Sequence, residues 1–158
     1  MILYLDASAL IKRYVAELGS AEVSSAISQA QVTGTALLSR AEVEAALAKA
    51  VRVNALTHEE ALTSLQVFRN EWPDLVRVQV TEMVVAHAGA FAWDHGLRGC
   101  DAVHLAAASA WQSALGERVT LATFDKHLWA AAESVGLEAY PADLPTMLET
   151  WRVAHQSP

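Results

Sequence analysis

The sequence predicts an α/β protein with a central, mostly parallel sheet covered by helices. Short apolar segments alternate with longer amphipathic segments along the chain, which is typical of β-α units and a parallel sheet. A chain of 158 residues suits one domain, large enough to bury about 70% of its unfolded surface. We therefore expect a single domain over residues 1–150 and a C-terminal tail at residues 151–158.

Five short apolar segments are the predicted strands, because each is bounded by turn residues or by a helical pattern. They are Ile2–Leu5, Thr35–Leu38, Leu75–Val78, Val119–Ala122 and Leu137–Tyr140. The first of them is apolar without interruption, as expected of a buried strand in a parallel sheet.

Seven longer segments with a helical pattern of apolar residues are the predicted helices. They are Ser8–Val15, Ser20–Gln29, Arg40–Arg52, His58–Asn70, Glu82–Asp94, Ala102–Leu115 and Lys126–Ser134. Glycines such as Gly34 and Gly136 fall between or just after these segments, where glycine ends a helix or turns the chain. The pair Trp72 and Pro73 ends the fourth helix, because the residue before proline avoids the α region.

Composition excludes several classes of protein. The net charge of −7 and the pI of 5.3 argue against broad electrostatic adhesion to nucleic acid, since neutralising phosphates takes clustered Lys and Arg. Cys100 is the one cysteine, and the N-terminus lacks the pattern of a signal peptide, so we expect a cytoplasmic location without a disulfide. The most apolar stretch, Ala102–Leu115, is shorter than the ~20 residues that span a bilayer, so no membrane segment is expected.

Four acidic residues stand where predicted strands end or predicted helices begin. Asp6 and Asp125 follow apolar stretches, Glu42 lies in the first turn after the second strand, and Asp101 opens the most apolar helix. Parallel α/β sheets place ligands at the carboxyl ends of their strands, so we expect the four side chains to converge. Converging carboxylates repel one another unless a cation lies among them. Oxygen ligands favour Mg²⁺, with Mn²⁺ as a substitute, over zinc.

Three of these residues also have a simpler explanation. Asp6 and Asp125 are well placed to cap the helices that follow them, which is a leading role for Asp. The segment Ser39–Glu42 matches a capping box, in which the Glu bonds back to the backbone N–H of the cap residue. Asp101 is harder to explain in this way, because it adjoins a stretch expected to pack closely, where an unpaired charge is costly.

Several linked motifs carry a family resemblance over residues 1 to about 140. They are Tyr4–Val15 followed by Gly19 and Ser20, then Ser39–Glu42, Leu97–Ala108 and Leu121–Asp125. In this order they resemble the PIN-domain family, and more narrowly the VapC-type toxins of bacterial toxin–antitoxin pairs. The resemblance implies a three-layer α/β/α domain and a metal-dependent endoribonuclease held silent by a small antitoxin.

Carried over by position, Asp6, Glu42, Asp101 and Asp125 match the catalytic, metal-binding quartet of that family, and Ser8 and Thr123 match the small polar residues beside it. Phe124 is a departure, because some members carry a second polar residue there. Cleavage of an RNA phosphodiester needs an activated water and stabilisation of the leaving oxygen, both of which Mg²⁺ can supply. The alternative is a non-catalytic PIN-like domain that binds a protein, which loss of a carboxylate would have favoured.

The remaining predictions concern contacts. Lys12, Arg13, Arg40 and Arg98 are candidates to touch RNA, although Lys and Arg also fill ordinary solvated helix faces. His104 shares a helix face with Asp101, yet a lone His in an Ala-rich helix is more often packed than a ligand, so it is left out of the metal site. Ala-rich helix faces permit close packing and favour a homodimer.

Overall fold

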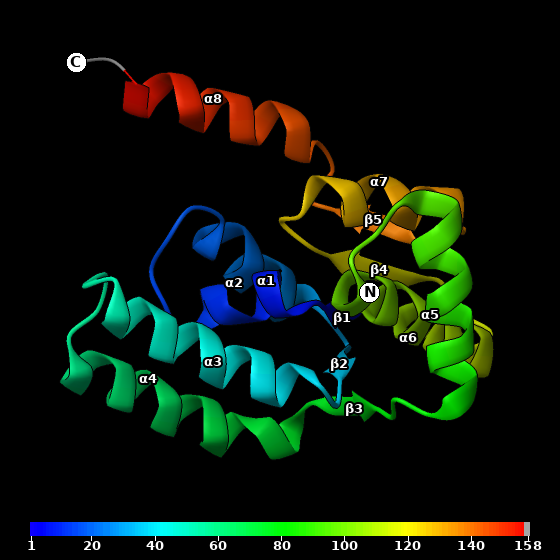
Figure 1. The fold of residues 1–158 in the computed structure, drawn as a ribbon, viewed down its shortest axis with the longest axis horizontal. Coiled ribbons are helices and arrows are strands. Elements are labelled where there is room, and N and C mark those ends of the chain that lie inside the picture. The colour runs from blue at the N-terminus through cyan, green and yellow to red at the C-terminus, as the bar shows by residue number, and fades with distance from the viewer. Residues whose placement is uncertain (157–158) are drawn as a thin grey trace.

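Five strands form one parallel sheet in this computed structural model, which describes residues 1–156 (Figure 1). They are β1 (Ile2–Leu5), β2 (Val32–Ala36), β3 (Val76–Val78), β4 (Val119–Ala122) and β5 (Glu138–Tyr140). Their order is β3-β2-β1-β4-β5, and every neighbouring pair is parallel. The strand order reverses at β1, and ligands of such sheets bind at the carboxyl side of this switch point.

Helices cover both faces of the sheet. They are α1 (Ala7–Leu10), α2 (Ser20–Gln29), α3 (Ser39–Arg52), α4 (His58–Glu71), α5 (Glu82–His95), α6 (Gly99–Leu115), α7 (Lys126–Ser134) and α8 (Leu144–Gln156), with 3₁₀ turns η1 (Ile11–Arg13) and η2 (Trp72–Asp74). The predicted α/β class with a parallel sheet is confirmed.

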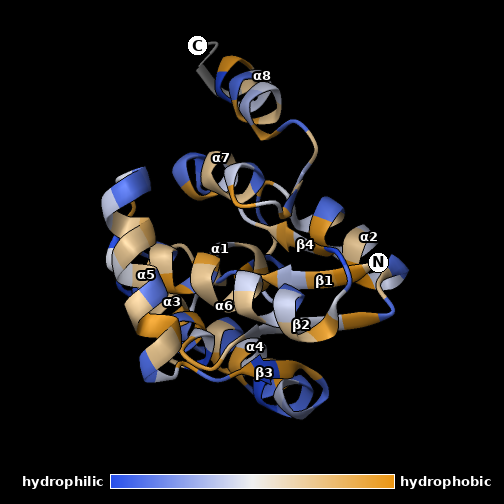
Figure 2. Cartoon of the chain, turned by 90° about the vertical axis from the view of Figure 1, so that its right-hand side faces the viewer, coloured by the Kyte–Doolittle hydropathy of each residue, from blue (hydrophilic) through white to orange (hydrophobic). Residues whose placement is uncertain are grey.

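Strand β1 lies at the centre of both hydrophobic cores. Side chains alternate across a strand, so Ile2 and Tyr4 pack with α5, α6 and α7, whereas Leu3 and Leu5 pack with α1 to α4. Leu3, Tyr4 and Leu5 are fully buried, which explains the uninterrupted apolar sequence of this strand. Figure 2 shows β1 in the middle of the sheet, with helices on either side.

Strand β2 begins three residues earlier than the predicted segment Thr35–Leu38, and Gly34 lies inside it rather than in a turn. The physical reason is a contact distant in sequence. A Cβ atom at Gly34 would lie 2.7 Å from the ring of Trp111 on α6. Glycine therefore lets this helix approach the strand closely.

Helix boundaries differ from the predictions at two places near the acidic residues. The predicted helix Ser8–Val15 is the short α1 followed by η1. Helix α6 begins at Gly99 instead of Ala102, so Asp101 lies in its first turn.

Helix α8 was not predicted, and the predicted end of the domain at residue 150 falls inside it. Its first turn is fixed by Asp143, whose Oδ1 accepts a hydrogen bond from the Thr146 N–H at 3.1 Å. The helix projects away from the rest of the chain (Figure 1), with Leu144 buried at its base. Residues 157 and 158 of the predicted tail lie outside the described residues. None of the helices within residues 1–156 is long and apolar enough to cross a membrane.

We expect Gly34→Ala to lower the free energy of unfolding by about 1–3 kcal/mol, because the added methyl group overpacks against Trp111. The matched control is Gly89→Ala, at an exposed site inside α5 where nothing lies within 4 Å of the added Cβ. That change should stabilise the protein by about 0.5–1 kcal/mol. Urea unfolding followed by circular dichroism measures both, and equal stability of the two variants would contradict the close packing of β2 and α6.

Candidate active site

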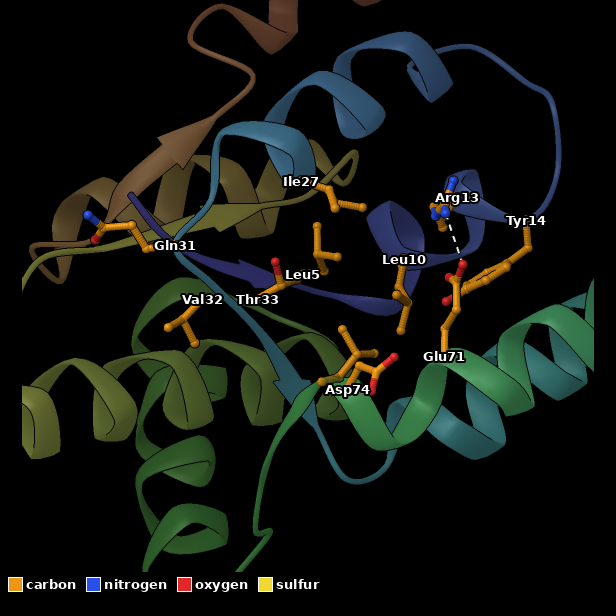
Figure 3. Close-up of a pocket in the computed structure, with 11 residues that line it drawn as sticks. Leu5, Leu10, Arg13, Tyr14, Ile27, Gln31, Val32, Thr33, Glu71 and Asp74 are labelled. Atoms are coloured by element: carbon orange, nitrogen blue, oxygen red, sulfur yellow. Dashed lines mark hydrogen bonds and ion pairs between the residues drawn. The ribbon is translucent and has the colours of Figure 1, made fainter.

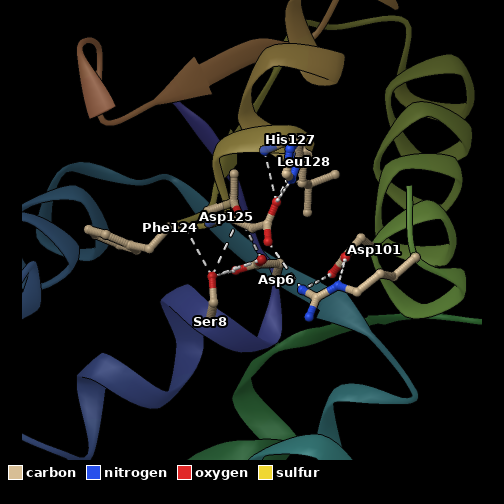
Figure 4. A network of polar contacts seen from close by, with 9 residues as sticks. Asp6, Ser8, Asp101, Phe124, Asp125, His127 and Leu128 are labelled. Atoms are coloured by element: carbon tan, nitrogen blue, oxygen red, sulfur yellow. Dashed lines mark hydrogen bonds and ion pairs between the residues drawn. The ribbon is translucent and has the colours of Figure 1, made fainter. Parts of the chain in front are cut away.

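Asp6 is buried at the carboxyl end of β1, with 3% of its surface exposed. Its Oδ1 accepts a hydrogen bond from the Ala9 N–H at 2.8 Å and so caps α1. Its Oδ2 accepts from the Thr123 hydroxyl at 2.7 Å, and the Ser8 hydroxyl lies within 2.9 Å of both oxygens (Figure 4). Burial raises the pKa of Asp6, while neighbouring His104 and the hydrogen bonds oppose part of that increase. Ser8 and Thr123 therefore do support the carboxylate beside which they were predicted to lie.

Asp125 combines capping with a place in the same site. Its Oδ1 accepts hydrogen bonds from the backbone N–H groups of His127 and Leu128 at 2.9 and 3.0 Å, which caps α7. Its Oδ2 accepts from Nη2 of Arg98 at 3.1 Å. One oxygen thus holds the helix start while the other faces Asp101 and Asp6 (Figure 4).

A single guanidinium group bridges two of the predicted ligands. Nε of Arg98 lies 2.7 Å from Oδ2 of Asp101, and Nη2 of Arg98 reaches Asp125 as well. The Arg98 side chain is 77% exposed, so this pair contributes little to stability. The geometry nevertheless shows that a cation fits between these two carboxylates.

Glu42 does not form the capping box that its sequence suggested. Ser39 lies inside α3, and its hydroxyl is 2.6 Å from the Thr35 hydroxyl in the core. Oε2 of Glu42 instead lies 2.8 Å from Nε2 of His104. A second segment with the same sequence pattern, Thr57 to Glu60 at the start of α4, does form both bonds of a capping box.

All four carboxylates line one pocket of about 260 Å³, at the edge of the sheet where β1 and β4 end and α3, α6 and α7 begin. Asp6, Glu42, Asp101 and Asp125 share it with Ser8, Arg98, His104 and Phe124. Within residues 1–156, no three acidic or histidine side chains stand close enough to surround one ion as they now lie. Each carboxylate is satisfied by protein donors instead. The all-oxygen set and the guanidinium held between two members still suit a hard cation.

Phe124 leaves no gap in the hydrogen bonding of the site. Its backbone N–H donates to the Ser8 hydroxyl at 2.9 Å, so the main chain makes the polar contact at this position. Its ring lies beneath the ammonium group of Lys12, which is 4.4 Å from the ring centre.

The four predicted RNA contacts differ in what they touch. Lys12 forms an ion pair with Glu17 at 2.8 Å, and Arg98 is bound to the carboxylates. Arg13 pairs with Glu71 at 2.9 Å. Arg40 makes no salt bridge within the part of the chain that the structure describes, and its side chain is exposed. Contact with RNA remains a prediction for all four.

A larger pocket of about 410 Å³ lies between α2 and the end of α4 (Figure 3). Its walls are mainly apolar, with Leu5, Leu10 and Ile27 among them, and the pair Arg13 and Glu71 stands at its rim. Two carboxylates, Glu71 and Asp74, line it, whereas four line the smaller pocket, so pocket size alone does not identify the candidate active site.

His104 is the residue of this site that the sequence interpretation left out. Its side chain is 2% exposed and bonds to Glu42 through one nitrogen and to Tyr4 through the other. The spacing of three residues from Asp101 was the available signal. It shows a shared helix face, but it does not show that Glu42 from another helix lies opposite.

Comparisons with known proteins identify the family to which this fold and sequence belong. The family described as "PIN domain" matches residues 3–134. Two proteins of Mycobacterium tuberculosis strains, named ribonuclease VapC45 and ribonuclease VapC49, are each 35% identical over 144 residues, which covers 90% of this chain and 97% of theirs.

Solved structures share the fold at lower identity. FitAcB from Neisseria gonorrhoeae matches with a TM-score of 0.61 and 18% identity over 90% of this chain and 98% of its own. PAE2754 from Pyrobaculum aerophilum has a TM-score of 0.61 and 19% identity over 94% and 90% of the two chains. A toxin–antitoxin complex from Klebsiella pneumoniae has a TM-score of 0.58 and 16% identity over 81% and 90%. From its sequence match and its fold, the chain belongs to the PIN-domain family and is a VapC-type member of it.

Proposed function

We propose that this chain is a divalent-metal-dependent endoribonuclease that acts as the toxin of a toxin–antitoxin pair. The observation that carries the proposal is the pocket in which Asp6, Glu42, Asp101 and Asp125 meet at the carboxyl edge of the sheet. The 35% identity to two proteins named ribonucleases supports the choice of RNA as substrate.

Asp6 and Asp101 are the proposed central metal ligands, with Glu42 and Asp125 completing the set directly or through water. Bound Mg²⁺ or Mn²⁺ would act as a Lewis acid toward the phosphate and make water a stronger nucleophile. Ser8, Thr123 and the first turn of α1 hold Asp6 still, so that little reorganisation is needed on binding.

Arg98 has two roles in this proposal. Its guanidinium offsets the repulsion between Asp101 and Asp125 while it lies between them. Because the side chain is largely exposed, it can turn toward solvent when a metal binds, and it then stands beside the pocket as a phosphate contact. Arg40 lines a separate hollow beside η2 and β3 rather than the acidic pocket, so its contact with RNA stays a prediction from the sequence alone.

A small antitoxin is the proposed partner. One structural neighbour is described as a toxin–antitoxin complex and another as FitAB bound to a DNA fragment. We propose that an antitoxin places an Arg or Lys among the four carboxylates, where charge-assisted hydrogen bonds neutralise the pocket. The position of Arg98 between Asp101 and Asp125 supports a guanidinium as the blocking group. A homodimer and a cytoplasmic location remain predictions from the sequence.

Asp6→Asn and Asp101→Asn should each reduce Mg²⁺-dependent cleavage of total cellular RNA by about 100-fold or more. Losing a residue that only orients a metal ligand already lowers activity by about 10–100-fold, and losing the ligand itself lowers it at least as much. Both variants should keep the melting temperature of the metal-free wild type, since removing like charge is not destabilising. Asp94→Asn, at an exposed site on α5, is the matched control and should cleave normally. Full activity in either pocket variant would remove that carboxylate from the proposed metal site, whereas a wild type that cleaves no RNA would end the nuclease assignment and favour a non-catalytic binding domain.

Glu42→Gln should abolish cleavage without a large change in melting temperature. The amide oxygen still accepts a hydrogen bond from His104, which preserves packing, but the negative charge is lost. Glu60→Gln supplies the control, because Glu60 belongs to a real capping box on the exposed helix α4. RNA cleavage and thermal unfolding are measured on both. Retained cleavage in Glu42→Gln would remove Glu42 from the metal site.

Expression of the chain alone should arrest bacterial growth, and co-expression of an antitoxin from a neighbouring gene should restore it. The antitoxin should also displace Mn²⁺ from the purified protein, measured by electron paramagnetic resonance of the released ion. Growth arrest that persists in the Asp6→Asn, Asp101→Asn double variant would place the toxicity elsewhere. If no small protein co-purifies, the nuclease assignment stands but the toxin–antitoxin assignment fails.

A further inference from the structure

We propose that Tyr4 and His104 are positioning residues that hold the Glu42 carboxylate in its metal-binding orientation. This inference rests on the proposed metal-dependent nuclease and adds two residues that do not contact the metal themselves. Tyr4 comes from β1, His104 from α6 and Glu42 from α3, so the three residues join the sheet to both helix layers at the edge of the pocket.

A continuous chain of hydrogen bonds links the three side chains. The Tyr4 hydroxyl lies 3.0 Å from Nδ1 of His104, and Nε2 of His104 lies 2.8 Å from Oε2 of Glu42. The rings of Tyr4 and His104 meet edge to face at a centroid distance of 6.0 Å. Tyr4 is fully buried and His104 nearly so, whereas Glu42 is partly exposed to the pocket.

The direction of these hydrogen bonds follows from the groups involved. A carboxylate only accepts hydrogen bonds, so Nε2 of His104 must carry the proton that points at Glu42. The remaining nitrogen, Nδ1, then accepts from the Tyr4 hydroxyl in the neutral ring. Tyr4 and Glu42 thereby favour the same tautomer of His104, the one that donates to Glu42.

Packing alone does not explain these polar groups. The surroundings of His104 on α6 are mostly Ala and Leu, and a buried imidazole or hydroxyl is costly unless it is hydrogen-bonded. An apolar residue would fill either place without that cost. Both polar groups instead direct their hydrogen-bonding atoms along one line that ends at the candidate metal ligand.

The consequence for Glu42 is a fixed side chain. His104 holds its Oε2, so fewer side-chain conformations must be given up on binding. Helix α6 carries Asp101 and His104 on one face, and β1 carries Tyr4 two residues before Asp6. The same two elements that place Asp6 and Asp101 therefore also place Glu42.

The test is Mn²⁺ affinity of the purified protein, measured by electron paramagnetic resonance without RNA. His104→Leu should raise the Kd for Mn²⁺ by about 10–100-fold. His104→Gln, which keeps a side-chain N–H donor toward Glu42, should restore affinity to within about 3-fold of wild type. Leu47→Ala, a buried apolar change on the same helix as Glu42, controls for lost packing, and His87→Leu controls for loss of an exposed His.

A second measurement does not depend on metal. Nitrogen NMR of ¹⁵N-labelled histidine should show His104 protonated at Nε2 in the wild type, and a mixture of tautomers in Tyr4→Phe, which keeps the ring but loses the hydroxyl. Unchanged Mn²⁺ affinity in His104→Leu, equal weakening by Leu47→Ala, or a proton on Nδ1 in the wild type overturns the positioning role while leaving the nuclease in place. A wild type that binds no Mn²⁺ overturns the proposed function itself.

Discussion

Burial of the Asp6 carboxylate at the end of β1 is the constraint on which the site depends. A charged group so deeply placed needs donors on several sides, and Ser8, Ala9 and Thr123 provide them from α1 and from the end of β4. The Asp6 backbone N–H also donates to the Ala122 carbonyl at 3.1 Å, which continues the pairing of β1 and β4 past the strand ends. The loops around Asp6 are therefore fixed by the need to satisfy it.

Capping and ligand placement turn out to be one arrangement rather than competing explanations. Asp125 caps α7 with one carboxylate oxygen, and its other oxygen faces the pocket. Asp6 caps α1 with Oδ1, which also accepts a hydrogen bond from the Ser8 hydroxyl. A capping carboxylate is held against a backbone that is itself rigid, so its free oxygen has little room to move. Helix starts at the carboxyl edge of a parallel sheet are thus well suited to present acidic groups.

The sequence predicts the parallel sheet, the strand β4 and the four carboxylates, because those depend on local patterns: an apolar run followed by Asp, or an acidic residue in a first helical turn. Features fixed by distant contacts were not predictable in the same way. The start of β2 depends on Trp111 filling the space beside Gly34, and the role of His104 depends on Glu42 facing it from another helix. Helix α8 does have local signals, because Asp143 is a good capping residue and Leu144 is the apolar residue that anchors the base of the helix.

The order of the strands has a consequence for how the protein is made. β1 is the first of the five strands to be synthesised, yet its neighbour β4 lies more than a hundred residues later, and Asp125 comes after β4. Until that segment has been synthesised, Asp6 lacks the Thr123 hydroxyl and the pocket lacks its fourth carboxylate. A nascent or truncated chain that ends before residue 123 therefore cannot assemble the complete acidic pocket. The topology itself delays assembly of this pocket until residue 125 has been synthesised.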